Sequence, residues 1–191
     1  MNLCTKKREA RVLFRQKRTE NILLVESSIL IQVKKLITTL SNESESENLV
    51  GIYWPLKDEV DLRSLKDISG LSLALPASRK KGELTYHRWT NTTLKKDVYG
   101  ILAPLEEPAL EPNQIKLLIV PALAIDRNGI RLGYGGGCFD RLRSKGMWKD
   151  IEALVIVPSA CISTSLLPKD KWDIPFDGWI NEKEIFRLEN R

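Results

Sequence analysis

The stretch that decides the fold is residues 115–141, IKLLIVPALAIDRNGIRLGYGGGCFDR. It begins with an almost entirely apolar run, residues 115–120, which is typical of a strand covered on both faces of a parallel sheet. The turn sequence DRNG at residues 126–129 comes next, and then four glycines within residues 133–137. Residues 139–145 predict a helix that begins directly after the glycines. The stretch therefore predicts a buried strand, a turn, a glycine loop and a helix.

The glycine loop predicts an anion site. Backbone N–H groups that glycines leave accessible, together with a helix N-terminus, attract negative charge. Arg131 precedes the loop, and its guanidinium can pair with phosphate oxygens at two points. The loop is not a P-loop, and as a dinucleotide fingerprint it reads G-x-G-x-x-C from Gly133, with Cys138 in the place of the third glycine. A glycine-rich turn without a ligand is the alternative interpretation.

Working outward, strands and helices alternate along the chain. Two N-terminal amphipathic helices are predicted, the first capped by Thr5 and the second spanning residues 22–40. Residues 58–69 predict another helix, residues 41–48 a polar loop and residues 103–113 a surface excursion. Further strands are predicted at residues 49–54, 71–75, 83–89 and 153–157. This alternation predicts an α/β fold: one domain over residues 1–191, a three-layer α/β/α sandwich with a mostly parallel sheet.

The net charge of +5 is concentrated at the N-terminus. Residues 1–18 hold seven Lys or Arg against Glu9 alone, a net +6, so the remaining residues carry about −1. A solvated helix face, a nucleic-acid arm, a clamp on a small polyanion and an organellar transit peptide all fit such a segment. Lys7 and Arg11 lie four residues apart, so on a helix they project from the same side.

Composition excludes several classes of protein. No apolar run reaches the roughly 18 residues of a membrane helix, so we expect no membrane partner. The three cysteines are widely spaced without a C-x-x-C pair, which indicates a reducing, cytoplasmic compartment and no structural zinc. His87 is the only histidine and no nucleophile elbow lies near it, which argues against a Ser-His-Asp hydrolase.

Carboxylates follow the glycine loop and a predicted strand. Asp140 comes directly after the loop, where it could hold Mg²⁺ against phosphates, and Asp173 is a second candidate. A helix cap or a solvated surface group is the simpler interpretation of either aspartate. Trp54 ends a predicted strand shortly before Glu59, at the position where α/β sheets present ligands.

Together these motifs resemble the 5-formyltetrahydrofolate cyclo-ligase family. DRNGIRLGYGGGCFDR at residues 126–141 is similar to that family's D-x-x-G-x-R-L-G-x-G-x-G-Y-Y-D signature. Weaker matches occur in family order: K-x-x-x-R from Lys7, DEVD at 58–61, YGILAP at 99–104, LLIVPALAID at 117–126 and WDIPFDGWI at 172–180.

The resemblance implies a Rossmann-like sandwich and an enzyme that converts ATP and 5-formyltetrahydrofolate to 5,10-methenyltetrahydrofolate, ADP and phosphate with Mg²⁺. It implies two small-molecule partners, no nucleic acid, and a monomer or weak dimer. Arg131 would act in catalysis, and Asp140 and Asp173 would serve Mg²⁺. The implied ATP contacts are Lys7, Arg11, Arg131, Leu132, Gly133, Tyr134, Gly135, Gly136, Gly137, Cys138 and Phe139. The implied substrate contacts are Trp54, Glu59, Tyr134, Gly135, Gly136, Gly137 and Cys138.

The chain departs from the family pattern in the glycine signature. Cys138 and Phe139 stand where family members commonly have two tyrosines, so an aromatic face and a hydroxyl are lost. This departure leaves open a related nucleotide-binding enzyme that activates another substrate. A nucleic-acid-binding protein that uses the basic N-terminus is a third possibility, which the near-neutral remainder disfavours.

Overall fold

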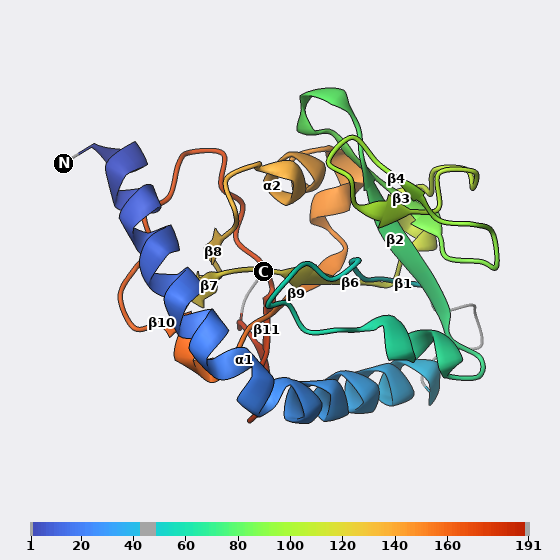
Figure 1. Cartoon of the computed structure of the whole chain (residues 1–191), viewed down its shortest axis with the longest axis horizontal. Helices are drawn as coiled ribbons and strands as arrows, with labels where there is room; N and C mark the ends of the chain where they lie inside the picture. The colour runs from blue at the N-terminus through green and yellow to red at the C-terminus, as the bar shows by residue number, and fades with distance from the viewer. Residues whose placement is uncertain (1, 43–48, 190–191) are drawn as a thin grey trace.

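The structure is a computed structural model and describes residues 2–42 and 49–189. These residues form a central seven-stranded sheet (Figure 1). Its strands, in spatial order, are β12 (Ile185–Arg187), β11 (Gly178–Ile180), β9 (Glu152–Ile156), β6 (Leu117–Pro121), β1 (Leu49–Gly51), β2 (Ser72–Ser78) and β3 (Leu84–Arg88). The edge strands β12 and β3 pair antiparallel, and the pairs between them are parallel. The predicted α/β class with a mostly parallel sheet is confirmed.

Each predicted strand lies in this sheet, with shifted ends. All five residues of β6 are buried, as are four of the five in β9, which agrees with strands covered on both faces. The strand predicted at residues 49–54 is shorter than expected. It ends at Gly51, and the chain then leaves the sheet toward the site described below.

The prediction of two N-terminal helices is wrong, because one helix, α1 (Leu3–Asn42), spans both. The cap at Thr5 is also wrong, since Asn2 Oδ1 accepts the Thr5 backbone N–H at 2.9 Å. Phe14 packs in the cluster that contains Leu118, whereas Ile29 packs in the cluster on the opposite face of the sheet. The N-terminal part of α1 therefore packs against one face of the sheet and the later part against the other face, so the helix carries two apolar stripes. Residues 43–48 of the predicted polar loop lie outside the described residues.

Among the described residues no helix, α1 included, is apolar enough over sufficient length to cross a membrane.

The helix predicted at residues 58–69 is also wrong. Asp58 has a positive φ of 65°, and Val60 and Leu62, which alternate in an extended segment, are both buried. Only a 3₁₀ helix, Arg63–Asp67, forms there. The spacing of charged and apolar residues favoured a helix, but an extended segment allows both Val60 and Leu62 to be buried.

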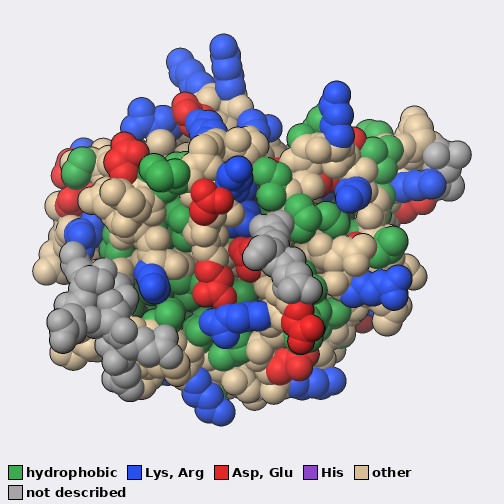
Figure 2. Space-filling view, turned by 180° about the vertical axis from the view of Figure 1, so that it is seen from behind, with side chains coloured by type: hydrophobic (Ala, Val, Ile, Leu, Met, Phe, Trp, Pro, Cys, Tyr) green, Lys and Arg blue, Asp and Glu red, His purple; other side chains and the backbone are tan. Residues whose placement is uncertain are grey.

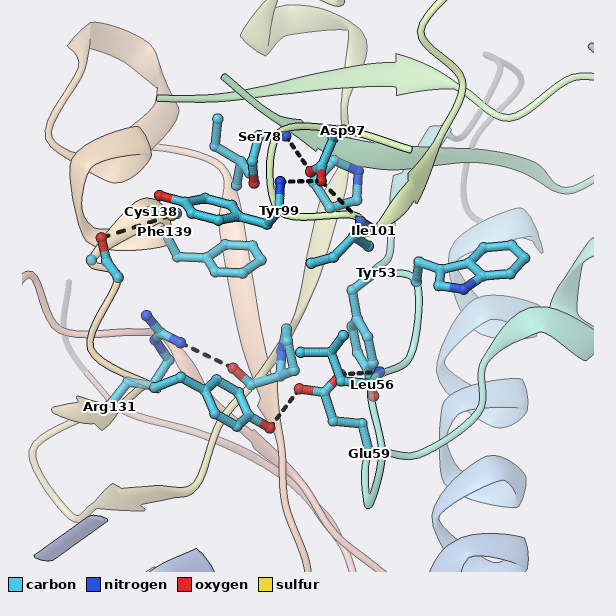
Figure 3. Close-up of a pocket in the computed structure, with 17 residues that line it drawn as sticks. Tyr53, Leu56, Glu59, Ser78, Asp97, Tyr99, Ile101, Arg131, Cys138 and Phe139 are labelled. Carbon is cyan, nitrogen blue, oxygen red and sulfur yellow. Dashed lines mark hydrogen bonds between the residues drawn. The ribbon is translucent and has the colours of Figure 1, made fainter. Parts of the chain in front are cut away.

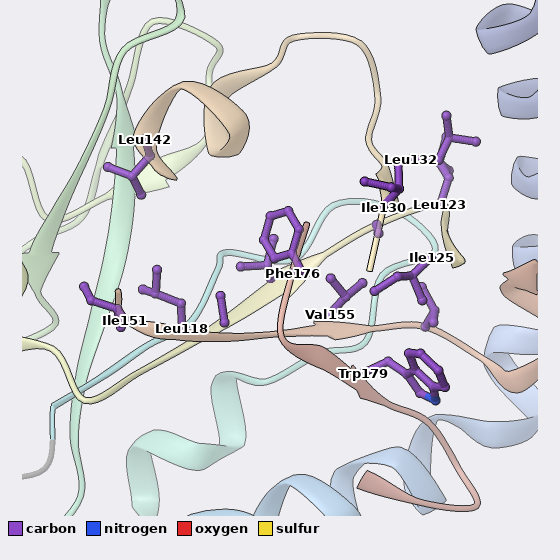
Figure 4. Close-up of a cluster of buried hydrophobic side chains, with 14 of the residues drawn as sticks. Leu118, Leu123, Ile125, Ile130, Leu132, Leu142, Ile151, Val155, Phe176 and Trp179 are labelled. Carbon is purple, nitrogen blue, oxygen red and sulfur yellow. The ribbon is translucent and has the colours of Figure 1, made fainter. Parts of the chain in front are cut away.

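The face of the sheet that carries Leu118, opposite the one against which Ile29 packs, is covered by less regular structure. Helix α2 (Cys138–Arg143) begins directly after the glycines, as predicted. Beside it lie a small sheet of β10 (Ile162–Ser163), β7 (Ala124–Asp126) and β8 (Arg131–Leu132), and 3₁₀ helices at Gly146–Lys149 and Ser159–Cys161. Figure 4 shows the core on this face, where Phe176 lies among Leu118, Val155 and Ile130. The helical layer here is thus much thinner than the one formed by α1.

Three further segments connect strands in the described part of the chain. Strands β4 (Lys95–Lys96) and β5 (Leu102–Ala103) pair antiparallel beyond the end of β3. The excursion at residues 103–113 meets β3 through the bridge His87–Ala109 and through the Leu110 backbone N–H, which donates to the Tyr86 carbonyl at 2.8 Å. It contains the 3₁₀ helix Pro112–Gln114. A further 3₁₀ helix, Lys80–Gly82, joins β2 to β3.

The turn before β8 requires glycine at position 129. Gly129 has φ +75°, and a Cβ there would lie 2.4 Å from the Phe176 carbonyl oxygen. We expect Gly129→Ala to lower the free energy of unfolding by about 3 kcal/mol, measured by denaturant titration. Gly70→Ala is the matched control, because Gly70 has φ +78° with no atom within 4 Å of a Cβ, so it should cost only about 1 kcal/mol. Equal losses in the two variants would contradict the steric explanation.

Candidate functional site

The glycine loop, residues 133–137, connects β8 to α2 and shares a cavity with residues at the carboxyl ends of β1 and β6. It separates two hollows in the described part of the molecule. A large cavity of about 350 Å³ lies on one side (Figure 3). A polar cavity of about 180 Å³ lies on the other. Ligands of α/β sheets bind at this edge, where parallel strands end.

The large cavity is mostly apolar with a few polar side chains. Tyr53, Trp54 and Glu59 enter it from the segment after β1, and Tyr99 and Ile101 from the connection between β4 and β5. The further lining residues are Leu56, Pro76, Ser78, Leu84, Asp97, Pro121, Arg131, Tyr134, Gly136, Gly137, Cys138 and Phe139. An apolar wall with a small number of fixed polar groups is typical of a site for a ring-containing small molecule.

Asp97 fixes the wall that carries Tyr99. Its carboxylate accepts the backbone N–H groups of Ser78, Tyr99 and Ile101 at 2.9, 2.9 and 3.0 Å (Figure 3). Tyr99 itself is 57% exposed, so its ring faces open space. Tyr99 opens the YGILAP match, but no role could be assigned to it from local residues, because its place in the wall depends on the contact of Asp97 with Ser78 of β2.

Glu59 is the buried carboxylate of the large cavity. Tyr134 Oη donates to its Oε1 at 2.6 Å, and the Leu56 backbone N–H donates to its Oε2 at 2.8 Å (Figure 3). Burial raises the pKa of Glu59, while these two hydrogen bonds and the charge of Arg18 oppose the rise. Burial also raises the pKa of Tyr134, which keeps its hydroxyl a hydrogen-bond donor.

Arg18 is a functional candidate that sequence reasoning missed. It is only 4% exposed, donates to the Ala122 carbonyl at 3.3 Å and to the Tyr134 hydroxyl, and lies 4.0 Å from Glu59 Oε1. The signal was present in the sequence, since Phe14, Arg18 and Ile22 lie four residues apart. A cation within a buried helical stripe indicates a partner of opposite charge.

The polar cavity gathers cations, carboxylates and backbone. Lys7 Nζ lies 2.7 Å from Asp170 and also donates to Asp173. Burial lowers the pKa of Lys7, but its hydrogen bonds to these aspartates outweigh burial and raise it overall. Arg11 Nε donates to the Gly133 carbonyl at 3.0 Å. The further lining residues are Arg131, Leu132, Gly135, Gly137, Asp140, Arg141 and Trp172.

Arg131 stands between the two cavities. It donates to the Pro121 carbonyl at 3.0 Å and pairs with Asp140 at 3.2 Å. Its guanidinium carbon lies 5.2 Å from the centre of the Phe139 ring and 5.3 Å from that of Phe176. Arg131 and Gly137 line both cavities, so molecules bound in the two would meet at these residues.

The structure divides the predicted contacts between the cavities. Predicted ATP contacts on the polar side are Lys7, Arg11, Arg131, Leu132, Gly133, Gly135 and Gly137. Tyr134, Gly136, Cys138 and Phe139, also predicted as ATP contacts, line the large cavity instead. Trp54, Glu59, Tyr134, Gly136, Gly137 and Cys138, predicted as substrate contacts, line the large cavity, whereas Gly135 lines the polar one.

The two predicted magnesium ligands lie in the polar cavity. Asp140 and Asp173 both line it, with Asp170 nearby, and each is paired with a cation. Among the described residues no group of three or more His, Cys, Asp or Glu side chains is arranged to hold a metal alone. Two carboxylates still fit Mg²⁺, which proteins commonly bind through one or two carboxylates together with phosphate oxygens.

A mostly apolar cavity and a polar, cation-lined cavity meet at Arg131 and Gly137, an arrangement typical of an α/β enzyme that brings two small molecules together. The model of the 5-formyltetrahydrofolate cyclo-ligase family matches residues 5–182. The chain therefore belongs to this family.

Similar proteins agree with this assignment. A 5-formyltetrahydrofolate cyclo-ligase of Haemophilus influenzae is 26% identical over 145 residues, which cover 71% of this chain and 76% of that protein. One of Escherichia coli K12 is 26% identical over 149 residues, covering 78% and 76%. The solved structure of Aquifex aeolicus 5,10-methenyltetrahydrofolate synthetase is 29% identical, has a TM-score of 0.74, and the match covers 97% of this chain and 94% of that one.

Proposed function

We propose that this chain catalyses the ATP- and Mg²⁺-dependent cyclisation of 5-formyltetrahydrofolate to 5,10-methenyltetrahydrofolate, with release of ADP and phosphate. Family membership and the names of the relatives support this reaction. The observation that carries it is the junction at Arg131 and Gly137, where a nucleotide in the polar cavity would meet a folate in the large cavity.

The reaction needs positioning more than a nucleophilic side chain. The formyl oxygen attacks the terminal phosphorus of ATP, and ADP leaves. The neighbouring nitrogen of the folate then attacks the formyl carbon, loses its proton, and phosphate departs with the former formyl oxygen. Ring closure is intramolecular, so it is fast once the reacting groups are held in place. Phosphoryl transfer requires alignment and charge stabilisation, which cations and backbone N–H groups supply.

Each part of the site has a role in this proposal. Lys7, Arg11 and Arg131 bind phosphate oxygens, and backbone N–H groups of the glycine loop assist. Glu59 binds polar hydrogens of the pterin inside the large cavity. Asp140 and Asp173 would hold Mg²⁺, which supplies neutralisation of phosphate charge when bound. Residues 1–191 act in this proposal as one domain.

The decisive experiment incubates purified protein with 5-formyltetrahydrofolate and ATP, with and without Mg²⁺. We expect methenyl product and ADP in a one-to-one ratio, and neither when Mg²⁺ is removed by a chelator. ADP formation without methenyl product would contradict the folate reaction and favour a related enzyme that activates another substrate. The departure at Cys138, which lines the large cavity, is the observation that favours this second candidate.

Nucleic-acid binding has less support. The basic N-terminus is partly used inside the molecule, because Lys7, Arg11 and Arg18 contact residues of the two cavities. Figure 2 shows one face of the molecule, on which the described acidic and basic side chains are interspersed. Affinity for an oligonucleotide that falls steeply with salt would revive this alternative.

The cysteine departure gives a testable prediction within the proposed function. Cys138 is partly buried in the wall of the large cavity, where the family signature has a tyrosine. We expect Cys138→Tyr to lower the KM for 5-formyltetrahydrofolate by about 2- to 10-fold, because a ring contact adds roughly 0.5–1.5 kcal/mol. Cys138→Ser, which adds no ring, should leave KM unchanged. A KM that is unchanged or raised in the tyrosine variant would contradict the idea of a lost aromatic contact.

A further inference from the structure

Trp172 is exposed at the entrance of the polar cavity. It lies in the segment between β10 and β11 and is 59% exposed. The other four tryptophans each contact a ring: Trp54 contacts Trp89, Trp148 stacks on Tyr86 and Trp179 stacks on Phe186. Within residues 2–42 and 49–189, Trp172 is the only tryptophan for which no ring contact is found. Trp172 lines the polar cavity, and an aromatic ring on a cavity wall offers a flat apolar surface to a bound molecule.

The surface beside Trp172 is shaped as a second, smaller hollow. We call it the outer slot: about 110 Å³, lined by Gly137, Asp140, Arg141, Ser144, Trp172 and Asp173. All of these except Ser144 also line the polar cavity, so the two hollows are continuous. Trp172 and Asp173 line the slot from the segment between β10 and β11, and Asp140 and Arg141 line it from α2.

Both walls of the outer slot are held in place. Arg141 on α2 donates to the Gly82 carbonyl at 3.1 Å and to the Gly136 carbonyl at 2.5 Å. Trp172 sits between Asp170 and Asp173, which both pair with Lys7 of α1. The Asp170 backbone N–H also donates to Asp173 Oδ2 at 2.7 Å, closing the loop on itself. The indole is therefore carried by a fixed turn, although its ring is exposed.

We propose that Trp172 stacks on the nucleobase of the nucleotide whose phosphates occupy the polar cavity. This inference rests on the proposed function and adds to it the residue that binds the base. A polyphosphate chain among Lys7, Arg11 and Arg131 leaves the slot as the continuous space for the rest of the molecule. A flat aromatic base would supply the ring contact that Trp172 does not have within the described residues. Stacking of this kind tolerates different bases.

The test separates base binding from phosphate binding. Calorimetry would measure the affinities of the wild type, Trp172→Ala and Trp172→Phe for ATP and for inorganic tripolyphosphate, all with Mg²⁺. We expect Trp172→Ala to bind ATP about 5- to 100-fold more weakly, as for other base–aromatic stacks. Its affinity for tripolyphosphate should not change, and Trp172→Phe should retain most of the ATP affinity. Quenching of tryptophan fluorescence by ATP should also be lost in Trp172→Phe.

Leu166→Ala is the matched control. Leu166 lies in the same segment and is 57% exposed, but it lines neither the polar cavity nor the outer slot. Its replacement should change neither affinity.

Two results would overturn the stacking role: unchanged ATP affinity in Trp172→Ala, or an equal loss for ATP and tripolyphosphate, which would indicate that Trp172 only shapes the loop. If the wild type cyclises the folate but Trp172→Ala binds ATP as tightly as the wild type, this inference is wrong and the proposed function stands. Trp172-dependent ATP binding without cyclisation would support it and contradict the proposed folate reaction.

Discussion

An Arg131→Ala variant is expected to lose about 10²- to 10³-fold in kcat/KM for cyclisation, the usual effect of removing one positioned charge from such a site. The side chain of Arg131 is only 4% exposed and stands where the two cavities meet. Its guanidinium is fixed by the Pro121 carbonyl, by Asp140 and by two aromatic rings. A cation held this firmly loses little entropy when it binds the phosphoryl group in transfer, so its removal should act mainly on the transition state.

Two further variants separate charge from geometry. Arg131→Lys keeps the charge but cannot bind in two directions at once, so it should fall between wild type and alanine. Arg127→Ala removes an exposed arginine four residues earlier and should leave kinetics unchanged. Steady-state rates would be measured after a thermal melt shows that each variant is folded. Turnover of Arg131→Ala within about threefold of wild type would place the critical charge elsewhere.

The central stretch of the sequence was sufficient to predict most of its own local structure, although the short strands β7 and β8 were missed. Strand β6, the turn at Gly129, the glycine loop and α2 follow one another within residues 117–143, so spacing and residue type decide them. The contacts of Lys7 with Asp170 and Asp173 join positions more than 160 residues apart. Only the family resemblance suggested that Lys7 and Asp173 belong to one site, because no local pattern reports on contacts of that range.

The division of the glycine loop between two cavities was also beyond the sequence. Gly133 and Gly135 line the polar cavity, whereas Tyr134 and Gly136 line the large one. Gly135 and Gly137 have positive φ values of 109° and 61°, so the turns of an irregular loop decide which cavity each residue faces. A run of glycines carries no apolar or polar pattern from which the sides could be assigned. The sequence therefore predicted one shared contact surface where the structure has two.

The largest effect expected outside the polar cavity is that of Arg18→Met. Arg18 donates to Tyr134, Tyr134 donates to Glu59, and the three form a buried chain with one positive and one negative end. Methionine keeps the length of the side chain and leaves the Glu59 carboxylate without a cation. Removing one partner of a buried ion pair costs about 3–5 kcal/mol, and we expect a loss at the lower end of that range near neutral pH.

The pH dependence of this variant has a defined sign. A carboxyl whose pKa is raised by folding binds more protons folded than unfolded between the two pKa values. The free energy of unfolding therefore falls as pH rises through that interval. Burial already raises the pKa of Glu59, and loss of the Arg18 charge should raise it further. In Arg18→Met the fall should thus be larger and extend to higher pH, as measured by urea unfolding across a pH series.

The double variant Arg18→Met/Glu59→Gln distinguishes charge from packing. If the uncompensated carboxylate causes the loss, the added glutamine should restore much of the stability and remove the extra pH dependence. It should not restore folate binding, because the proposed pterin contact needs an ionised carboxylate. For the same reason, when the pH is lowered, the substrate affinity of Arg18→Met should begin to fall at a higher pH than the affinity of the wild type, because Glu59 is protonated earlier. If the double variant is as unstable as Arg18→Met and the pH profiles coincide, Arg18 acts through packing and the buried chain carries no charge coupling.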